Sequence, residues 1–331
     1  SRWLAGCMGS NLSCQGLPLM GYQFRVPHGS VLGFHTLPPH AAELRYCSTQ
    51  DAPFTMSLTK ESILITGCGS GIGKALARAF HQAGHHVCAT ARRPETMADL
   101  RTEGIMTLAL DVTDAHAVDA VLQTLRQQGV WVSTLVNNAG YGAMGPISDV
   151  STDEWRKQFD VNLFAPMALT RAVLPDMAQH KRGRIINISS VSGVMTTPFS
   201  GPYCASKAAM NAASDALRME LKPLGIDVIT VQPGGIQSAF GDNAGNQVSL
   251  SATSLFAPIR EGVMARANES QSGAMPAHQF AAELVAKVLS PQCPAVIRLG
   301  PKSTLMPILK QWLPTRLLDR ILSKRFHLNR L

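Results

Sequence analysis

A tyrosine and a lysine stand four residues apart at Tyr203 and Lys207, and Ser190 precedes them. Residues at this spacing lie on one side of an α-helix, so a helix over Tyr203–Lys222 would hold the phenol beside the ammonium group. A free phenol has a pKa of about 10, and a nearby positive charge favours its ionised form. The pair predicts an acid/base Tyr203 tuned by Lys207, with Ser190 donating a hydrogen bond to a substrate oxygen. Tyr and Lys also occur at this spacing by chance, so the rest of the chain must support the prediction.

A glycine-rich turn lies upstream, between a short apolar run and a helical pattern. It spans Thr66–Gly73 and reads TGCGSGIG. Glycine lets the backbone approach a pyrophosphate closely, and the N-terminus of the following helix attracts negative charge. The turn therefore predicts a dinucleotide site, and the alternative is a tight strand-to-helix turn that binds nothing. The predicted contacts here are Gly67, Ser70, Gly71, Ile72 and Gly73.

Two arginines, Arg92 and Arg93, follow the second apolar run. An NAD site usually places an acidic residue at the end of this strand to hold the ribose 2′-hydroxyl, and here the position is Ala91. Arginine can instead bind a 2′-phosphate through charge-assisted hydrogen bonds. The sequence predicts NADP(H) rather than NAD(H), and the alternative is that both arginines are ordinary solvated loop residues.

Polar residues also follow the third and fourth apolar runs. Asp111 either accepts a hydrogen bond from an adenine amino group or caps the helix that starts near Asp114. The two amides of Asn137-Asn138 are predicted to tie neighbouring strands together and to border the cofactor, although Asn and Gly are also common turn residues. The predicted cofactor contacts of these segments are Asp111, Val112, Asn138, Ala139 and Gly140.

Seven short apolar runs alternate with helical patterns along the chain. The runs are Ser62–Thr66, His86–Ala91, Met106–Leu110, Thr134–Val136, Arg184–Ile188, Asp227–Val231 and Ala295–Leu299. The helical patterns are Gly73–Ala83, Pro94–Thr102, Asp114–Gln128, Thr152–Gln179, Tyr203–Lys222 and Ala277–Leu289. This alternation predicts an α/β fold, a single doubly wound Rossmann-type parallel sheet with helices on both faces. Right-handed crossovers place the carboxyl ends of the strands, and hence the cofactor, at one edge.

The ends of the chain differ from this body in composition. We predict an irregular, disordered extension over 1–56, a dinucleotide-binding oxidoreductase domain over 57–300 and a basic amphipathic tail over 301–331. Of the formal net charge of +8, residues 300–331 carry seven Lys/Arg against one acid, a net of +6. Because the excess charge lies in the tail, we predict that the core does not bind nucleic acid.

The tail combines apolar helical stripes with Lys and Arg. Leu305, Ile308, Leu309, Trp312 and Leu313 form one stripe, and Leu317, Leu318, Ile321 and Leu322 form another after Pro314. Such a segment can lie on an anionic membrane surface or pack on protein while its charges stay in water. We expect it to pack on its own domain or on a partner subunit, and peripheral membrane contact is the alternative.

Seven cysteines show no regular spacing and no C-x-x-C pair, so we predict no metal site and a reducing compartment. No apolar run is clean enough to span a bilayer. We therefore expect an intracellular, cytoplasmic protein. Organelle targeting by the basic, acid-poor N-terminal extension is the alternative.

Taken in order, these motifs resemble those of the short-chain dehydrogenase/reductase family over about Leu58–Leu299. The resemblance rests on T-G-x-x-x-G-x-G at Thr66–Gly73, N-N-A-G at Asn137–Gly140, Ser190, Y-x-x-x-K at Tyr203–Lys207 and Pro233-Gly234. It implies that Tyr203 exchanges the proton, that Lys207 tunes it and binds the nicotinamide ribose, and that Ser190 holds the substrate oxygen.

The resemblance also implies further site residues. Asn162 would support a water-linked proton relay, and the alternative is a polar residue inside a helix that bonds to the backbone. Pro233, Gly234, Ile236 and Ser238 would contact the cofactor. Ser238 replaces the threonine of many relatives and keeps the hydroxyl.

Within the family, the chain looks most like the branch of 17β-hydroxysteroid and retinol dehydrogenases. This resemblance rests on Ala89–Pro94, Tyr141-Gly142 and Pro198–Tyr203. It implies an NADP(H)-dependent oxidoreductase that interconverts an alcohol and a ketone or aldehyde on a lipophilic steroid-, retinoid- or acyl-ketone-like substrate. Homo-oligomers are a family-level expectation. The alternative from another class is a non-catalytic, dinucleotide-binding regulator, which has no need for Tyr203 and Lys207.

Overall fold

The structure is a computed structural model that describes residues 58–238, 248–269 and 271–331. Its central element is a parallel sheet with the strand order β3-β2-β1-β4-β5-β6-β7. The strands are β1 (Lys60–Ile65), β2 (Val87–Ala91), β3 (Met106–Ala109), β4 (Val130–Asn137), β5 (Gly183–Ile188), β6 (Ile226–Pro233) and β7 (Val296–Leu299). The α/β fold predicted from the alternating runs is therefore confirmed.

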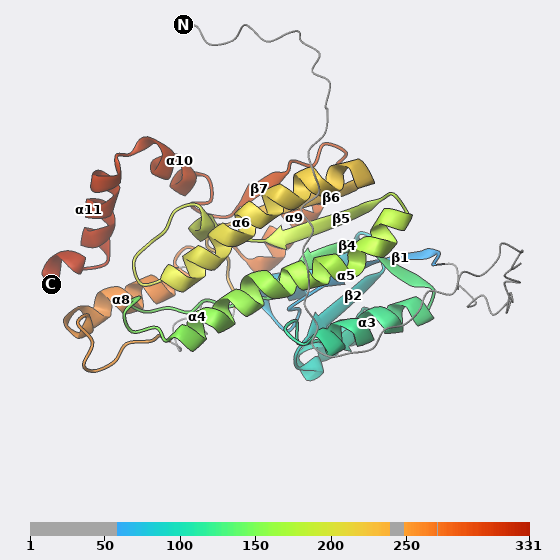
Figure 1. Cartoon of the computed structure of the whole chain (residues 1–331), viewed down its shortest axis with the longest axis horizontal. Helices are drawn as coiled ribbons and strands as arrows, with labels where there is room; N and C mark the ends of the chain where they lie inside the picture. The colour runs from blue at the N-terminus through green and yellow to red at the C-terminus, as the bar shows by residue number, and fades with distance from the viewer. Residues whose placement is uncertain (1–57, 239–247, 270) are drawn as a thin grey trace, which may run out of the picture. The chain divides into compact units, whose positions relative to one another are not determined.

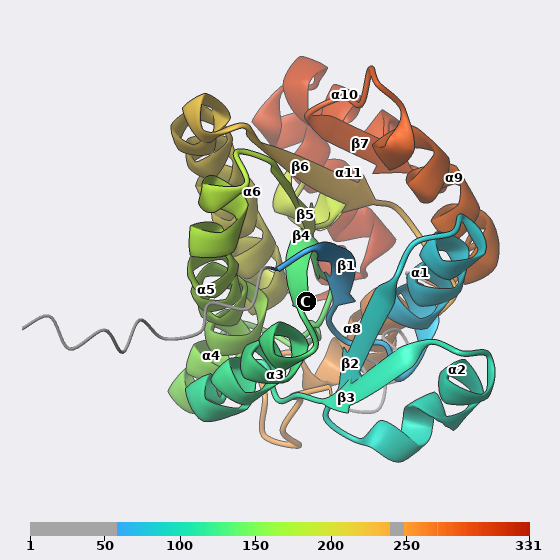
Figure 2. The ribbon, with the colours of Figure 1, turned by 90° about the vertical axis from the view of Figure 1, so that its right-hand side faces the viewer.

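Helices cover both faces of this sheet, as Figure 2 shows. One face carries α1 (Gly71–Gln82), α2 (Ala98–Thr102) and α9 (Ala277–Leu289). The other face carries α3 (Ala115–Gln127), α5 (Ala165–Gln179) and α6 (Gly201–Leu221). The other α-helices of the described residues are α4 (Thr152–Phe159), α8 (Arg260–Asn268), α10 (Leu305–Trp312) and α11 (Thr315–Arg325).

Alternating side chains of the strands pack into two apolar cores, one on each face of the sheet. Ile63 and Ile65 of β1 pack with α1 and α9 on one face, where Phe80 and Phe280 are fully buried. Leu64 points to the other face and packs with α3 and α5. Because both faces are covered, the strands are almost continuously apolar, which is why they stand out in the sequence.

The order of the strands reverses beside β1. Ile65 pairs with Ala89 of β2 on one side and with Val136 of β4 on the other. The connections after β1 and β4 therefore leave the sheet toward opposite faces at its carboxyl edge. This is the place where doubly wound sheets bind dinucleotides.

The helix predicted over Thr152–Gln179 is interrupted. A π-helical turn, Asp160–Phe164, separates α4 from α5. A π turn holds one more residue per turn than an α-helix and changes the direction in which its side chains point. Here it carries Asn162, whose side chain is 1% exposed. Sequence periodicity alone did not reveal this break.

The segment Gly235–Pro276 between β6 and α9 is long and weakly patterned in the sequence, which predicts a loop over the substrate side. Its apolar residues were expected either to line a substrate pocket or to cover the sheet; they are Phe240, Leu250, Leu255, Phe256 and Met264. In the structure, part of the segment is helix α8. The buried residues of α8 are Gly262, Val263, Arg266 and Ala267. A glycine and a charged residue at buried positions give no apolar period, so the pattern hid the helix.

The tail forms α10 and α11, at the same end of Figure 1 as α8, and the end of α11 lies nearest to α8. Phe326 is buried against Ile259 and Val263, and Leu322 packs around it. Lys302 and Arg325 both pair with Glu269, at 2.7 and 2.6 Å. The tail therefore packs on its own domain, as expected. None of the helices in the described ranges is long and apolar enough to cross a membrane.

Candidate active site

The glycine turn is fastened to the end of β4 by hydrogen bonds. Asn138 donates from its side-chain amide to the carbonyl oxygens of Thr66 (2.8 Å) and Gly67 (3.2 Å). The Thr66 hydroxyl accepts from the backbone N–H groups of Asn138 and Ala139, both at 3.0 Å. The neighbouring Asn137 donates to the Asn187 side chain at 2.8 Å and so ties β4 to β5. The two amides tie strands together as the sequence predicted.

The glycines of this turn have little room for a side chain. A Cβ on Gly73 would overlap the Gly67 carbonyl oxygen and the Asn138 amide. Gly67 and Gly71 have φ of +73° and +54°, which favours glycine. Ser70 precedes α1, but its side chain makes no capping hydrogen bond. Among the described residues the first N–H groups of α1 thus have no capping side chain, and such groups suit an anion like a pyrophosphate.

The two arginines after β2 are exposed at the carboxyl edge of the sheet. Neither side chain forms an ion pair with another described residue. Asp111 lies close enough for the charge of Arg92 to help lower its pKa. Burial opposes that shift, and hydrogen bonds from Thr113 favour it. This edge thus offers free guanidinium groups and no acidic residue at position 91.

Asp111 does not cap the following helix. The N-cap of α3 is Asp114, whose carboxylate accepts from the N–H groups of His116 (2.9 Å) and Ala117 (3.3 Å). Asp111 instead accepts from the backbone and hydroxyl of Thr113, at 3.0 and 2.7 Å. The capping alternative is therefore wrong, and the adenine contact stays a prediction. Val112 beside it is buried.

The structure brings Ser190 and Tyr203 together. Ser190 follows β5 and caps a short helical turn, accepting from the N–H of Ser192 at 3.0 Å. Tyr203 lies in the first turn of α6, is buried, and is hydrogen-bonded with Ser190. Burial raises the pKa of Tyr203 to about 12, against the opposing effects of Ser190 and Arg266. The direction is opposite to the one expected from Lys207, so the phenol is protonated at neutral pH.

Lys207 lies one turn further along α6 and is 5% exposed. Its ammonium group donates to the carbonyl oxygen of Ile188 at 2.8 Å. Burial lowers the pKa of Lys207 to about 8. The backbone carbonyl at the end of β5 therefore holds the ammonium group. The loss of solvation makes the protonated form of Lys207 less favourable than it is in water.

Asn162 connects the loop after β4 to α6. Its amide donates to the carbonyl of Tyr141 (3.0 Å) and to the Ser206 hydroxyl (3.1 Å), and its oxygen accepts from the Tyr141 N–H at 3.2 Å. A Cβ on Gly140 would lie 3.0 Å from the Asn162 oxygen and 3.7 Å from the Lys207 nitrogen. Asn162 and Lys207 therefore flank Gly140 at the same edge.

The segment after β6 reaches the glycine turn. A Cβ on Gly71 would lie 2.7 Å from the Cβ of Ser238. Ile236 is buried and bridges to Met275, while Gln271 donates to the Ser238 carbonyl at 3.1 Å. Pro233 ends β6 and Gly234 follows it. These predicted cofactor residues thus lie at the same edge of the sheet as the turn.

Sequence reasoning missed Arg266 in α8. It is 5% exposed and donates from Nε to the Thr197 hydroxyl at 2.5 Å. No acidic side chain of the described residues pairs with it. The adjacent Ala267 packs against Tyr203 and Met144. An arginine in a segment without periodicity gives no signal of burial, so only the fold reveals that its charge lies near the phenol.

Part of the expected substrate side is visible. Phe256 packs edge-on against Phe199 with ring centroids 5.7 Å apart, and Leu250 joins the same apolar cluster. Leu255 is exposed instead. Phe240, also considered for this side, lies outside the described residues. The apolar surroundings of the site are therefore built from α8 and the segments before α6 and α8.

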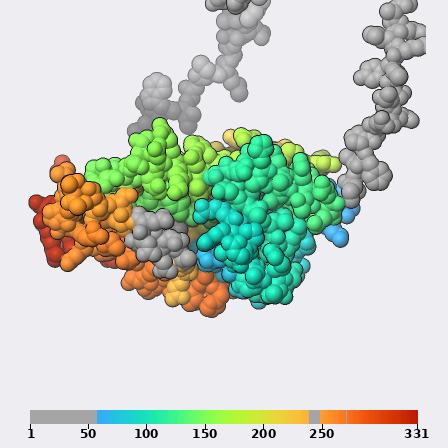
Figure 3. All heavy atoms as spheres, turned by 90° about the horizontal axis from the view of Figure 1, so that it is seen from below, coloured from blue at the N-terminus to red at the C-terminus, as the bar shows by residue number. Residues whose placement is uncertain are grey.

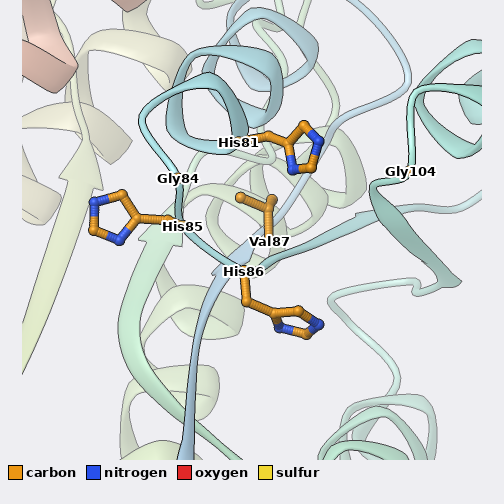
Figure 4. A pocket seen from close by; sticks show the side chains of 6 residues that line it. All are labelled: His81, Gly84, His85, His86, Val87 and Gly104. Atoms are coloured by element: carbon orange, nitrogen blue, oxygen red, sulfur yellow. The ribbon is translucent and has the colours of Figure 1, made fainter.

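A separate shallow cavity lies at the opposite, amino-terminal end of β2. Its lining includes His81, His85 and His86, whose imidazoles point in different directions in Figure 4. Within the described ranges no group of His, Cys, Asp and Glu is arranged to hold a metal ion. This cavity takes no part in the site at the carboxyl edge.

Sequence comparison agrees with the geometry. The family described as short chain dehydrogenase matches residues 61–249. The uncharacterized oxidoreductase YbbO of Escherichia coli is 40% identical over 57% of this chain and 71% of its own length. A 3-ketodihydrosphingosine reductase of Bacteroides thetaiotaomicron is 42% identical over 55% and 66% of the two chains. An NADPH-dependent 3-dehydrocapnine reductase of Ornithobacterium rhinotracheale is 33% identical over 79% and 95%.

Solved structures share the fold. A short-chain dehydrogenase from Streptomyces avermitilis has a TM-score of 0.67 at 28% identity, covering 82% of this chain and 98% of that one. The closed form of serine dehydrogenase with NADP+ has a TM-score of 0.63 at 26% identity, covering 73% and 96%. A 4-hydroxyisoleucine dehydrogenase with NADH has a TM-score of 0.60 at 25% identity, covering 72% and 97%. Neighbours of this fold thus bind either nicotinamide cofactor.

Proposed function

Because the chain belongs to the short-chain dehydrogenase/reductase family and is an NAD(P)-dependent oxidoreductase, we propose that it uses NADP(H) to interconvert an alcohol and a ketone or aldehyde on a lipophilic molecule. Tyr203 is the acid/base of this reaction. The observation that carries the proposal is the buried, hydrogen-bonded pair of Tyr203 and Ser190 beside Lys207.

In the reducing direction Tyr203 donates its phenolic proton to the substrate oxygen. Its pKa of about 12 keeps the proton in place at neutral pH. Ser190 holds the substrate oxygen through its hydroxyl, and bound NADPH supplies the hydride. As the proton leaves, the positive charges of Lys207 and Arg266 stabilise the phenolate that forms. Oxidation of an alcohol reverses these proton movements.

Preference for NADP(H) is supported by charge at the end of β2. The exposed guanidinium groups of Arg92 and Arg93 suit a 2′-phosphate, and Ala91 offers no carboxylate to repel it or to bind a 2′-hydroxyl. The name of the 3-dehydrocapnine reductase states NADPH dependence, which points the same way.

A lipophilic substrate is supported by the surroundings of Tyr203. The phenol lies in a cluster with Met144, Ala267 and Val248. Phe199 and Phe256 lie on the same side of the sheet edge. These walls favour burial of an apolar chain or ring system. A relative named for 3-ketodihydrosphingosine is consistent with a ketone on a long lipid.

Tyr203→Phe tests the proposal. Removing one hydroxyl should reduce kcat by about 10²–10⁴-fold, the usual contribution of a general acid. The NADPH Kd, measured by fluorescence, should stay within about twofold, because the ring remains. Turnover is measured as NADPH oxidation with steroid, retinoid and long-chain acyl ketones, and with a small polar ketone for comparison.

Two outcomes would contradict the proposal. Full activity of the Phe variant would remove Tyr203 from the chemistry. A wild-type protein that binds NADPH but turns over no carbonyl compound in the panel would favour the non-catalytic regulator instead.

A further inference from the structure

The C-terminal helices carry a surface that the fold leaves uncovered. We define the C-terminal amphipathic surface by five apolar residues of α10 and α11 and three basic residues of α11. They are Leu305, Ile308, Trp312, Leu317, Ile321, Arg316, Arg320 and Lys324. In the space-filling view the C-terminal residues lie at one end of the described domain, next to the segment that contains α8 (Figure 3).

One side of α11 is already anchored. Leu318 is buried, Leu322 packs against Phe326, and Arg325 pairs with Glu269 at 2.6 Å. Burial raises the pKa of Glu269, but the hydrogen bonds and charges of Lys302 and Arg325 lower it by more, so the carboxylate remains charged. These contacts fix the orientation of the helix and thereby decide which residues face outward.

The apolar residues of the surface are left exposed by the part of the chain that the structure describes. Trp312 is 76% exposed, Leu305 54% and Ile321 48%. Leu305, Ile308 and Trp312 fall at i, i+3 and i+7, which places them on one side of α10. Leu317 and Ile321 form the corresponding row on α11. Two adjoining helices with outward apolar rows are unusual for a surface that meets only water.

The basic residues form a second row beside the apolar one. At about 100° per residue, Arg316, Arg320 and Lys324 lie next to Leu317 and Ile321 and away from the packed side of α11. All three are exposed, and no ion pair joins them or Lys310 to another described residue. Asp319 is the one acidic residue in 300–331. On α11 the apolar row is therefore bordered by a row of positive charge on the side away from the packed residues.

We propose that this surface docks on a lipid bilayer that contains anionic headgroups. The apolar rows enter the boundary between headgroups and acyl chains, and the basic row contacts lipid phosphates, as in interfacial amphipathic helices. Trp312, the most exposed apolar residue of α10, is of the type that prefers this boundary. A second copy of the chain fits less well, because a two-fold contact would bring the same unpaired positive charges together.

Contact between this surface and a bilayer would bear on the proposed function, because packing links the surface to the candidate active site. α11 packs on α8 through Phe326, and Ala267 of α8 packs on Tyr203. Docking would thus place the apolar walls of the substrate side close to the bilayer. The lipid contact does not depend on the proposed function, and its test requires no turnover.

Binding of the full-length protein to vesicles tests the proposal. We expect co-sedimentation with phosphatidylcholine vesicles that contain phosphatidylglycerol, and at least tenfold weaker binding to pure phosphatidylcholine. Each Lys or Arg near an anionic surface contributes about fivefold. Arg316→Glu with Arg320→Glu and Lys324→Glu should therefore reduce binding on the order of a hundredfold or more. Leu305→Ser with Ile308→Ser and Trp312→Ser should abolish it even at low salt.

Control variants distinguish binding through this surface from non-specific adsorption of exposed apolar residues to vesicles. Met219→Ser removes a comparably exposed apolar residue from α6 and should bind vesicles like wild type. Tryptophan emission should shift to the blue on binding, and Trp312→Phe should bind while losing that shift. Activity on a soluble ketone should be unchanged in every variant.

Three results would overturn the proposal. They are equal binding to neutral and anionic vesicles, wild-type binding by the triple Ser variant, and a shift from dimer to monomer in the triple Ser variant with no lipid binding by the wild type. The last would assign the surface to a second copy of the chain.

Discussion

The nucleotide side and the substrate side of the site are held together in different ways. The turn between β1 and α1 is fixed by directional hydrogen bonds, in which the Asn138 amide donates to the Thr66 carbonyl and the Thr66 hydroxyl accepts from the Asn138 backbone N–H. On the substrate side, α8 is held against the C-terminal segment by apolar packing around Phe326 and by two ion pairs to Glu269. Directional bonds demand particular residue types at particular positions, whereas packing accepts many side chains of similar volume. A motif can therefore mark the first region but not the second.

This contrast predicts that single changes on the nucleotide side affect cofactor affinity, and those on the substrate side affect turnover. The largest effect is expected for Gly73→Ala. Its Cβ would meet the Gly67 carbonyl and the Asn138 amide, neither of which can move without breaking the turn. The NADPH Kd should rise more than a hundredfold, and the free energy of unfolding should fall by about 1–3 kcal/mol.

Gly104→Ala is the matched control for that measurement, because nothing lies within 4 Å of a Cβ at this position. It should lose some stability from its positive φ and keep NADPH affinity. Normal NADPH binding by Gly73→Ala would contradict the prediction that single changes on the nucleotide side affect cofactor affinity.

Lys207→Met is expected to lower activity while raising the free energy of unfolding. Loss of the ammonium should lower kcat about a hundredfold or more. The variant should nonetheless be more stable near pH 7. The folded-state pKa of about 8 lies below the ordinary value of 10.5, so the unfolded chain binds the proton more tightly. That difference corresponds to on the order of 3 kcal/mol, offset in part by the lost bond to Ile188.

The pH dependence provides the check. The penalty for burying the charged Lys207 is fully present below about pH 8 and disappears as the pH rises to 10.5, where the lysine is neutral in both states. Urea unfolding at pH 7 and pH 10 should therefore show the variant's advantage shrinking as the pH rises. An advantage that does not change with pH would mean that burial of the Lys207 charge is not its cause.

Arg92→Ala with Arg93→Ala should have a smaller effect, confined to the nucleotide side. Loss of charge-assisted bonds to a 2′-phosphate should raise the KM for NADPH about 10–100-fold. The KM for NADH should stay within about threefold, because NADH lacks that phosphate. Equal changes for both cofactors would disprove the 2′-phosphate contact. Arg101→Ala, which removes an arginine from α2, is the control.

The smallest effect is expected for Arg266→Met on the substrate side. Its charge opposes the rise in the pKa of Tyr203, so its loss should raise that pKa further. Alcohol oxidation should then need a higher pH, and kcat at neutral pH should fall about three- to tenfold. The NADPH Kd should not change, and Arg266→Lys should restore part of the rate. An unshifted pH profile would make Arg266 a packing residue only.

Most of the sheet could be predicted because each strand is a short apolar run with its own turn signals. Helix α9 was predicted over the range that the structure shows. Strand β4 was predicted only over Thr134–Val136, although it spans Val130–Asn137. Ser133 and Thr134 interrupt its apolar run, and β1 shifts register opposite this stretch, between Ser62 and Ile63.

The site was predictable where chemistry fixes both residue type and spacing. Ser190, Tyr203 and Lys207 were all named from their types and spacing; the structure adds a hydrogen bond between Tyr203 and Ser190, and Asn138 holds the glycine turn. The ionisation of Tyr203 was not predictable, because it depends on how deeply the phenol is buried. Arg266 could not be found either, since its proximity to Tyr203 arises from a helix without an apolar period.

The π turn at Asp160–Phe164 makes the site vulnerable to an unusual kind of genetic change. Its extra residue could be removed by an in-frame loss of a single codon, which would allow α4 and α5 to join as one regular helix. The residues beyond would then rotate by about 100° relative to α4. Local helix formation would improve, while Asn162 would lose its contacts with Tyr141 and Ser206. In this segment a deletion should be more harmful than most substitutions, even though it makes the helix more regular.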